Sequence, residues 1–190
     1  SQGGHLECVK YLVGEKGADV DAANKDGFTA VMYASLGGHL ECVKYLVGEK
    51  GADVDAANKD GFTAVMYASL GGHLECVKYL VGEKGAGVDA ATKNGMTAVI
   101  RASQGGHLEC VKYLVGEKGA GVDAATKNGM TAVIRASQGG HLECVKYLVG
   151  EKGADVDAAN KDGFTAVMYA SLGGHLECVK YLVGEKGAGV

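Results

Sequence analysis

A stripe of apolar side chains at helical spacing marks residues 38–47. Its members are Leu40, Val43, Leu46 and Val47. Glu41 and Lys44 fall on the opposite side, so the pattern predicts an amphipathic helix. Because glycine readily adopts the left-handed conformation that stops a helix, we expect this one to end at Gly48, before Glu49-Lys50-Gly51.

A turn and a shorter helix follow that glycine-rich end. Residues 52–61 read as an extended stretch that closes on Asp60-Gly61, a strong local signal for a tight hairpin turn. Thr63 is placed to cap a helix over residues 64–70, because its hydroxyl can accept from the free N–H groups of the first turn. The pattern therefore predicts a turn, a first helix and a second helix in succession.

The whole chain consists of copies of this unit, 34 residues apart. The copies start at Ser1, Ser35, Ser69, Ser103, Ser137 and Ser171, and the sixth is partial and ends at Val190. A short unit repeated at a fixed period cannot bury its apolar face alone and does so against its neighbours. We therefore predict one continuous array over residues 1–190 and no separate domains.

The unit resembles the ankyrin repeat. The resemblance runs through Asp60-Gly61-Phe62-Thr63, the turn of helix at Ala68, Gly72-His73-Leu74-Glu75 and Gly51-Ala52-Asp53-Val54, and it recurs over the whole chain. It implies an all-α solenoid of stacked helix-turn-helix units with protruding β-turns, which serves to bind proteins.

Two features depart from the family pattern. The family's Thr-Pro-Leu-His becomes Thr-Ala-Val-Met at residues 29–32 and Thr-Ala-Val-Ile at residues 97–100. The period of 34 exceeds the family's usual 33. We place the extra residue in the segment 48–51, between the second helix and the next turn.

The copies fall into two types that differ in the turn and first helix. The aromatic type has Phe and Tyr there and occupies residues 19–36, 53–70 and 155–172, whereas the arginine type has Met and Arg and occupies residues 87–104 and 121–138. The second helices carry no type difference. Complete copies of the first type have three basic and five acidic residues each, and those of the second type have four and three. Every difference between the two types therefore falls in the turn and first helix.

In the ankyrin family, turn tips and first helices line the concave surface that holds partners. Exposed aromatic and arginine side chains are frequent anchors of such interfaces. The alternative is that Phe28 and Met96 merely pack on neighbouring turns, and that the two types reflect drift or an arbitrary design choice. The contact set implied by the resemblance is Asp26, Phe28, Tyr33, Leu36, Asp60, Phe62, Tyr67, Leu70, Asn94, Met96, Arg101, Gln104, Asn128, Met130, Arg135, Gln138, Asp162, Phe164, Tyr169 and Leu172.

Composition and charge narrow the class of protein. Hydrophobic residues make up 47% of the chain, which is enough for a core, and the absence of proline and tryptophan beside 32 glycines requires small and aliphatic packing. A net charge of −4, with Arg101 and Arg135 as the two arginines, argues against a nucleic-acid surface. No apolar run approaches the roughly 20 residues of a membrane span, so we expect a soluble protein that binds neither nucleic acid nor membrane.

One cysteine recurs on each second helix. The six are Cys8, Cys42, Cys76, Cys110, Cys144 and Cys178. Stacked helices lie about 8–10 Å apart, which exceeds the Cα separation of a disulfide. We therefore expect buried, reduced thiols and a cytoplasmic, reducing location.

No motif predicts catalysis, a metal site or a cofactor. His5 and Cys8 supply two ligands per copy, whereas zinc needs four that converge. The resemblance instead gives the Gly-His pair a bracing role, through hydrogen bonds to the backbone at the entrance of the second helix. The calcium-like run at residues 24–27 lacks the acids required at the positions of Ala22 and Tyr33.

These observations predict a non-catalytic scaffold that binds a protein or peptide on its concave face. The alternative is a structural or self-assembling array acting as filament, spacer or spring. The near-identity of the copies fits an engineered origin as well as recent tandem duplication. Neither end has a polar capping repeat, so we expect either flanking repeats in a longer protein or head-to-tail association of the ends.

Overall fold

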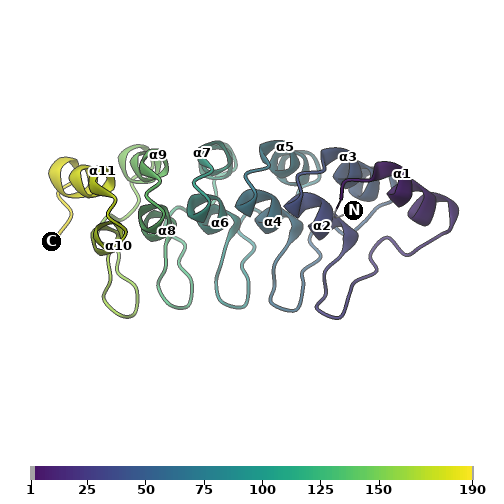
Figure 1. The fold of residues 1–190 in the computed structure, drawn as a ribbon, viewed down its shortest axis with the longest axis horizontal. Helices are drawn as coiled ribbons and strands as arrows, with labels where there is room; N and C mark the ends of the chain where they lie inside the picture. The colour runs from purple at the N-terminus through teal and green to yellow at the C-terminus, as the bar shows by residue number, and fades with distance from the viewer. Residues whose placement is uncertain (1–2, 190) are drawn as a thin grey trace.

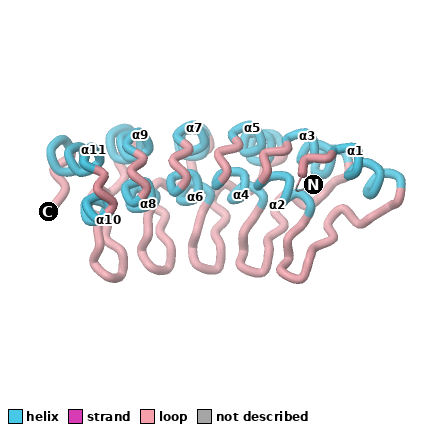
Figure 2. The backbone as a smooth tube through the Cα atoms, in the orientation of Figure 1, coloured by secondary structure: helices cyan, strands magenta, loops and turns pink. Residues whose placement is uncertain are grey.

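The computed structural model describes residues 3–189 as one row of helix pairs (Figure 1). Two layers of helices run the length of the row, and long loops project from one side of it (Figure 2). Within these residues the backbone forms helices and isolated antiparallel bridges, such as the one between Ala57 and Thr63, but no strand. The all-α repeat fold predicted from the sequence is confirmed.

The first helices begin where the sequence predicts. They are α2 Ala30–Leu36, α4 Ala64–Leu70, α6 Ala98–Gln104, α8 Ala132–Gln138 and α10 Ala166–Leu172. A threonine with extended backbone precedes each one. Its hydroxyl accepts a hydrogen bond from the N–H three residues on at Thr29, Thr97, Thr131 and Thr165. Thr63 keeps the backbone conformation, but among the described residues its hydroxyl accepts no such bond.

The second helices each have two parts. An α-helical part comes first: α1 Leu6–Val9, α3 Leu40–Val43, α5 Leu74–Val77, α7 Leu108–Val111, α9 Leu142–Val145 and α11 Leu176–Val179. It runs without a break into a wider π-helical part: Lys10–Glu15, Lys44–Glu49, Lys78–Glu83, Lys112–Glu117, Lys146–Glu151 and Lys180–Glu185. The second helix is therefore longer than the apolar stripe alone indicates.

The expected end of the second helix at Gly48 is wrong. The helix continues to Glu49, where the N–H of Lys50 donates to the carbonyl of Tyr45 at 3.0 Å, a bond that spans five residues. The glycine that adopts the left-handed conformation is Gly51, with φ of +71°. The extra residue of the 34-residue period is thus taken up within the helix by a π-turn, because such a turn encloses one residue more than an α-turn.

Gly48 and its equivalents other than Gly184 are required by a close approach from the next repeat. At Gly82 a Cβ would collide with the hydroxyl of Tyr113, whereas no described atom lies within 4 Å of a Cβ at Gly184. We predict that Gly82→Ala lowers the free energy of unfolding by about 1–3 kcal/mol through overpacking. The matched variant Gly184→Ala should be neutral or stabilising by up to about 1 kcal/mol. Urea unfolding followed by circular dichroism measures both, and equal effects at the two positions would contradict the close approach.

The core lies between the two helix layers and between neighbouring repeats. The largest fully buried side chains include Leu46, Leu80, Leu114 and Leu148, one on each internal second helix. The first helices contact one another in chain order, from α2 through α4, α6 and α8 to α10. Each repeat therefore depends on its neighbours for burial, as a solenoid requires.

Three polar contacts recur from one repeat to the next. His107 Nε2 lies 2.8 Å from the carbonyl oxygen of Leu70. The equivalent histidines make the equivalent contact with the carbonyl oxygen 37 residues earlier in the chain: His73, His141 and His175. The carboxylate of Asp55 accepts from the N–H of Gly87 at 2.9 Å. The N–H of Lys93 donates to the carbonyl of Asp60 in the preceding turn at 2.9 Å. The bracing role expected for the histidine is confirmed, and it acts between repeats.

Candidate binding surface

The hairpin surface, which we define as the projecting turns together with the first helices α2, α4, α6, α8 and α10, carries the predicted contact set apart from Met130. The residues at the turn tips are exposed: Asp26, Asp60, Asn94, Asn128 and Asp162. Those at the ends of the first helices range from half-buried Leu70 to Leu172, which is 73% exposed, with Leu36, Gln104 and Gln138 also exposed. Both groups are open to a partner.

Met130 does not belong to this surface, although the sequence analysis includes it. It is 6% exposed, and its sulfur lies 3.8 Å from the side-chain amide nitrogen of Asn160 in the following turn. At this position the alternative reading is correct, because the methionine packs on its neighbour. Its equivalent Met96 is half-buried.

The aromatic side chains of two neighbouring repeats form one cluster, which an arginine of the third repeat extends, whereas Phe164 and Tyr169 form a separate pair. The ring of Phe28 lies 5.3 Å from the rings of both Tyr33 and Tyr67, and Phe62 lies 5.7 Å from Tyr67. The guanidinium of Arg101 then stacks over Phe62 at 4.6 Å. Such contacts are favourable by about 0.5–1.5 kcal/mol each, so the same rings both stabilise the stack and present a rigid edge to solvent.

Asparagines that the sequence analysis did not include hold the tyrosines in place. The side-chain amide of Asn58 donates to the hydroxyl of Tyr67 at 3.0 Å, while its oxygen accepts from the N–H groups of Asp60 and Phe62. Asn24 and Asn160 make the corresponding bonds to Tyr33 and Tyr169. Burial raises the pKa of Tyr67, so its phenol stays neutral at physiological pH.

In the arginine-type repeats, both the asparagine and the tyrosine of that hydrogen-bonded pair are replaced. Thr92 stands where the aromatic type has asparagine, and its hydroxyl accepts from the N–H of Met96 at 3.0 Å. Arg101 stands where the aromatic type has tyrosine, and its Nη1 donates to Gln104 at 3.3 Å. Asparagine and tyrosine thus change together because they bond to each other, and this joint change is the signal that could have identified the asparagines.

A pocket of about 230 Å³ opens on the hairpin surface between the two arginine-type repeats. Its lining residues are Asn94, Met96, Thr126, Lys127, Asn128, Met130 and Arg135. Arg135 donates from Nη1 to Gln138 at 2.9 Å, but its Nε is buried and has no hydrogen-bond partner among the described residues. Burial lowers the pKa of the equivalent Arg101, but an arginine remains charged at neutral pH.

The opposite face of the array is uniform and charged. Each second helix carries a solvent-exposed pair such as Glu75 and Lys78, whose charged atoms lie 3.3 Å apart. Exposed pairs of this kind add little stability. The face repeats without variation along the chain, so it offers no feature that distinguishes one repeat from another.

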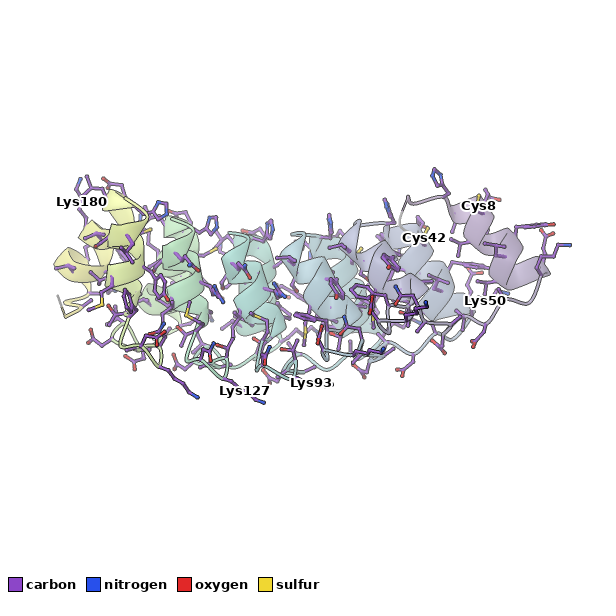
Figure 3. All side chains as sticks on the ribbon, turned by 60° about the horizontal axis from the view of Figure 1, so that its bottom comes forward. Cys8, Cys42, Lys50, Lys93, Lys127 and Lys180 are labelled. Carbon is purple, nitrogen blue, oxygen red and sulfur yellow. The ribbon has the colours of Figure 1, made fainter. Side chains whose placement is uncertain are left out.

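The cysteines lie inside this second-helix layer, with one exception. Five are buried, but Cys8 is exposed, contrary to the expectation of buried thiols throughout. It lies on α1, at the end of the row, where no described helix covers its outer side (Figure 3). Within residues 3–189 no three His, Cys, Asp or Glu side chains converge on a possible metal position.

In a comparison with known protein families, one family model matches the entire chain. The family model described as "Ankyrin repeats (3 copies)" matches residues 1–58, 50–126, 66–160 and 118–190. The chain belongs to the ankyrin repeat family. Ankyrin repeats are in general protein-protein interaction modules and act as non-catalytic scaffolds. No curated protein sequence matches this ankyrin array significantly.

The helices of the ankyrin array are short. Among those that the structure describes, none has the length and apolar character needed to span a bilayer.

Proposed function

We propose that this ankyrin array is a scaffold that binds a partner protein on its concave hairpin surface in a reducing, intracellular compartment. The observation that carries the proposal is that all differences between the two repeat types fall in the turns and first helices, most of them at exposed or half-buried positions. The second helices keep one sequence throughout, as purely structural elements would. The hairpin surface also presents the aromatic and arginine side chains that anchor protein interfaces.

The cysteines support the proposed reducing compartment. An exposed thiol such as that of Cys8 would form intermolecular disulfides in an oxidising environment, so its exposure fits a reducing one.

A pull-down with matched variants tests the binding face. The triple variant Tyr33→Ala, Tyr67→Ala and Tyr169→Ala should lose partner binding, at more than about 1 kcal/mol for each true anchor, which is about a fivefold weaker affinity per residue. The control triple Glu41→Ala, Glu75→Ala and Glu177→Ala alters exposed side chains on α3, α5 and α11, the second helices that follow the first helices of the three tyrosines. It should bind as the unaltered array does.

Replacing tyrosine by alanine also removes packing contacts, so a second set of variants keeps the aromatic rings. The Tyr→Phe variants at the same positions keep the rings and remove only the hydroxyls that bond to asparagine. If the glutamate variant loses the partner while both tyrosine variants retain it, the hairpin surface is not the binding face.

Self-assembly is a second candidate function, favoured by apolar surface at both ends of the row. Leu12 is 52% exposed at one end and Leu176 is 59% exposed at the other. A pocket of about 410 Å³ lies beside Phe164, Met168 and Leu172. Contacts between unlike ends do not close and so extend into a filament. Light scattering over a concentration series, with and without polar capping repeats, separates a growing filament from a monomeric scaffold.

A further inference from the structure

The order of repeat types places two arginine-type turns side by side once in the chain. Residues 87–104 and 121–138 are of this type, with aromatic-type segments on either side. At this junction the turn tips carry Asn94 and Asn128, whereas the other three tips carry aspartate. The pocket that Arg135 lines lies at this junction.

Positive charge gathers around the junction. Lys93 and Lys127 project from neighbouring turns on the same edge of the array, away from Lys180 on the second-helix side (Figure 3). Arg101 and Arg135 follow on the first helices α6 and α8. Asp89 and Asp123 are the acidic residues of these two turns, and each accepts a backbone N–H from the next repeat through one carboxylate oxygen. The junction therefore has a local excess of cations in a chain whose net charge is negative.

The two arginines occupy equivalent positions but have different surroundings. Arg101 follows an aromatic-type repeat and stacks over Phe62 at 4.6 Å. Arg135 follows an arginine-type repeat, where Met96 replaces the phenylalanine, and the pocket opens there. A buried donor on a charged group without an acceptor is unfavourable, so Arg135 Nε is a group that a ligand oxygen would satisfy.

The free edge of Arg135 defines the chemistry of that ligand. Gln138 takes up Nη1, and Nε is buried, so the guanidinium must turn toward the pocket before its Nε–Nη2 edge meets a planar group with two oxygens. A carboxylate matches this edge in a bidentate arrangement. The side chains of Asn94 and Asn128, and the ammonium of Lys127, add further donors around the pocket.

We propose that this pocket receives an aspartate or glutamate side chain from an acidic segment of the partner protein. The inference rests on the proposed scaffold function and deepens it, because it fixes the register of the partner on the array. The carboxylate would pair with Arg135, and the surrounding lysines would favour further acidic residues of the same segment. Because the charges are partly exposed, affinity falls as salt concentration rises.

Fluorescence anisotropy with a synthetic peptide tests this proposal on the full chain. The probe is a labelled peptide of glutamate residues in a glycine-serine background, with matched peptides that carry glutamine or phosphoserine instead of glutamate. The glutamate peptide should bind at least tenfold more tightly than the glutamine peptide. Equal affinities for these two would overturn the proposal, and so would binding of the phosphoserine peptide without the glutamate peptide.

Matched arginine variants locate the site. Arg135→Gln should weaken glutamate-peptide binding at least tenfold, whereas Arg101→Gln, at the equivalent position over Phe62, should weaken it less than about threefold. Arg135→Lys keeps the charge but lacks Nε–H, and it should behave like Arg135→Gln. Circular dichroism confirms that each variant folds. Equal losses for Arg101→Gln and Arg135→Gln would show general charge attraction and overturn the pocket.

The outcome is separable from that of the scaffold function. A partner captured through the tyrosine positions but unaffected by Arg135→Gln leaves the scaffold function standing and removes the pocket proposal. A glutamate peptide that binds through Arg135, with no partner captured on the hairpin surface, gives the reverse result.

Discussion

Replacing four buried serines by alanine is expected to raise the free energy of unfolding by about 2–4 kcal/mol in total. The residues are Ser35, Ser69, Ser103 and Ser137, each 0% exposed on a first helix. Their hydroxyl oxygens have no hydrogen-bond partner among the described residues. A buried hydroxyl without a partner has lost its bonds to water, and alanine has the higher helix propensity. Urea unfolding of the quadruple variant measures the gain.

Ser171 provides the matched control for that prediction. It is the equivalent serine of α10, but it is exposed, so its hydroxyl remains hydrated. Ser171→Ala should gain only the difference in helix propensity, about 0.5 kcal/mol. A quadruple variant that is less stable than the unaltered array would mean that the serine hydroxyls make bonds that stabilise the folded state.

Thiol reactivity is expected to divide the six cysteines into one fast residue and five slow ones. Burial raises the pKa of Cys76, Cys110 and Cys144 to about 11 and raises those of Cys42 and Cys178 as well. Because the thiolate is the reactive form, the first three should react with Ellman's reagent at pH 8 at least about 100-fold more slowly than an exposed thiol of ordinary pKa. Cys8 is exposed and should react first.

The same pKa shifts give a pH dependence of defined sign. The folded-state pKa of the Cys76, Cys110 and Cys144 thiols, about 11, lies above the unfolded value of about 8.5. The folded chain therefore holds more protons than the unfolded chain between these two pH values. Stability should therefore fall as pH rises from about 8.5 to 11, and labelling should accelerate with it. In guanidinium chloride all six thiols should react together. Rapid labelling of four or more in the native state would contradict the burial of the second helices.

The repeat pattern predicts the first helix and its start well, because local chemistry determines both. Residues 64–70 follow a threonine and precede a glycine pair, and α4 Ala64–Leu70 has those bounds in the structure. By contrast, the predicted end of the second helix is wrong, because no local signal at Gly48 shows that the N–H of Lys50 donates to the carbonyl of Tyr45. The tyrosine of the next repeat explains the glycine there, and its approach depends on stacking geometry.

Prediction of the candidate site has a similar limit. The positions that vary between repeat types are evident from the chain itself, and most of them lie on the hairpin surface. Sequence spacing does not show which neighbour each side chain meets, because every repeat has the same pattern. The stacking of Arg101 over Phe62, the burial of Met130 and the pocket at Arg135 all depend on the order of types along the row.

Site-specific photo-crosslinking tests the central claim, that partners bind on the hairpin surface, most directly. A photoreactive amino acid placed at Gln104, at the exposed end of α6, is compared with one at Glu109, exposed on the paired second helix α7. The account predicts partner cross-links from position 104 and none from position 109, with the position 104 cross-links lost in the tyrosine triple variant. Cross-links from position 109 alone, or equal cross-links from both positions, would contradict it.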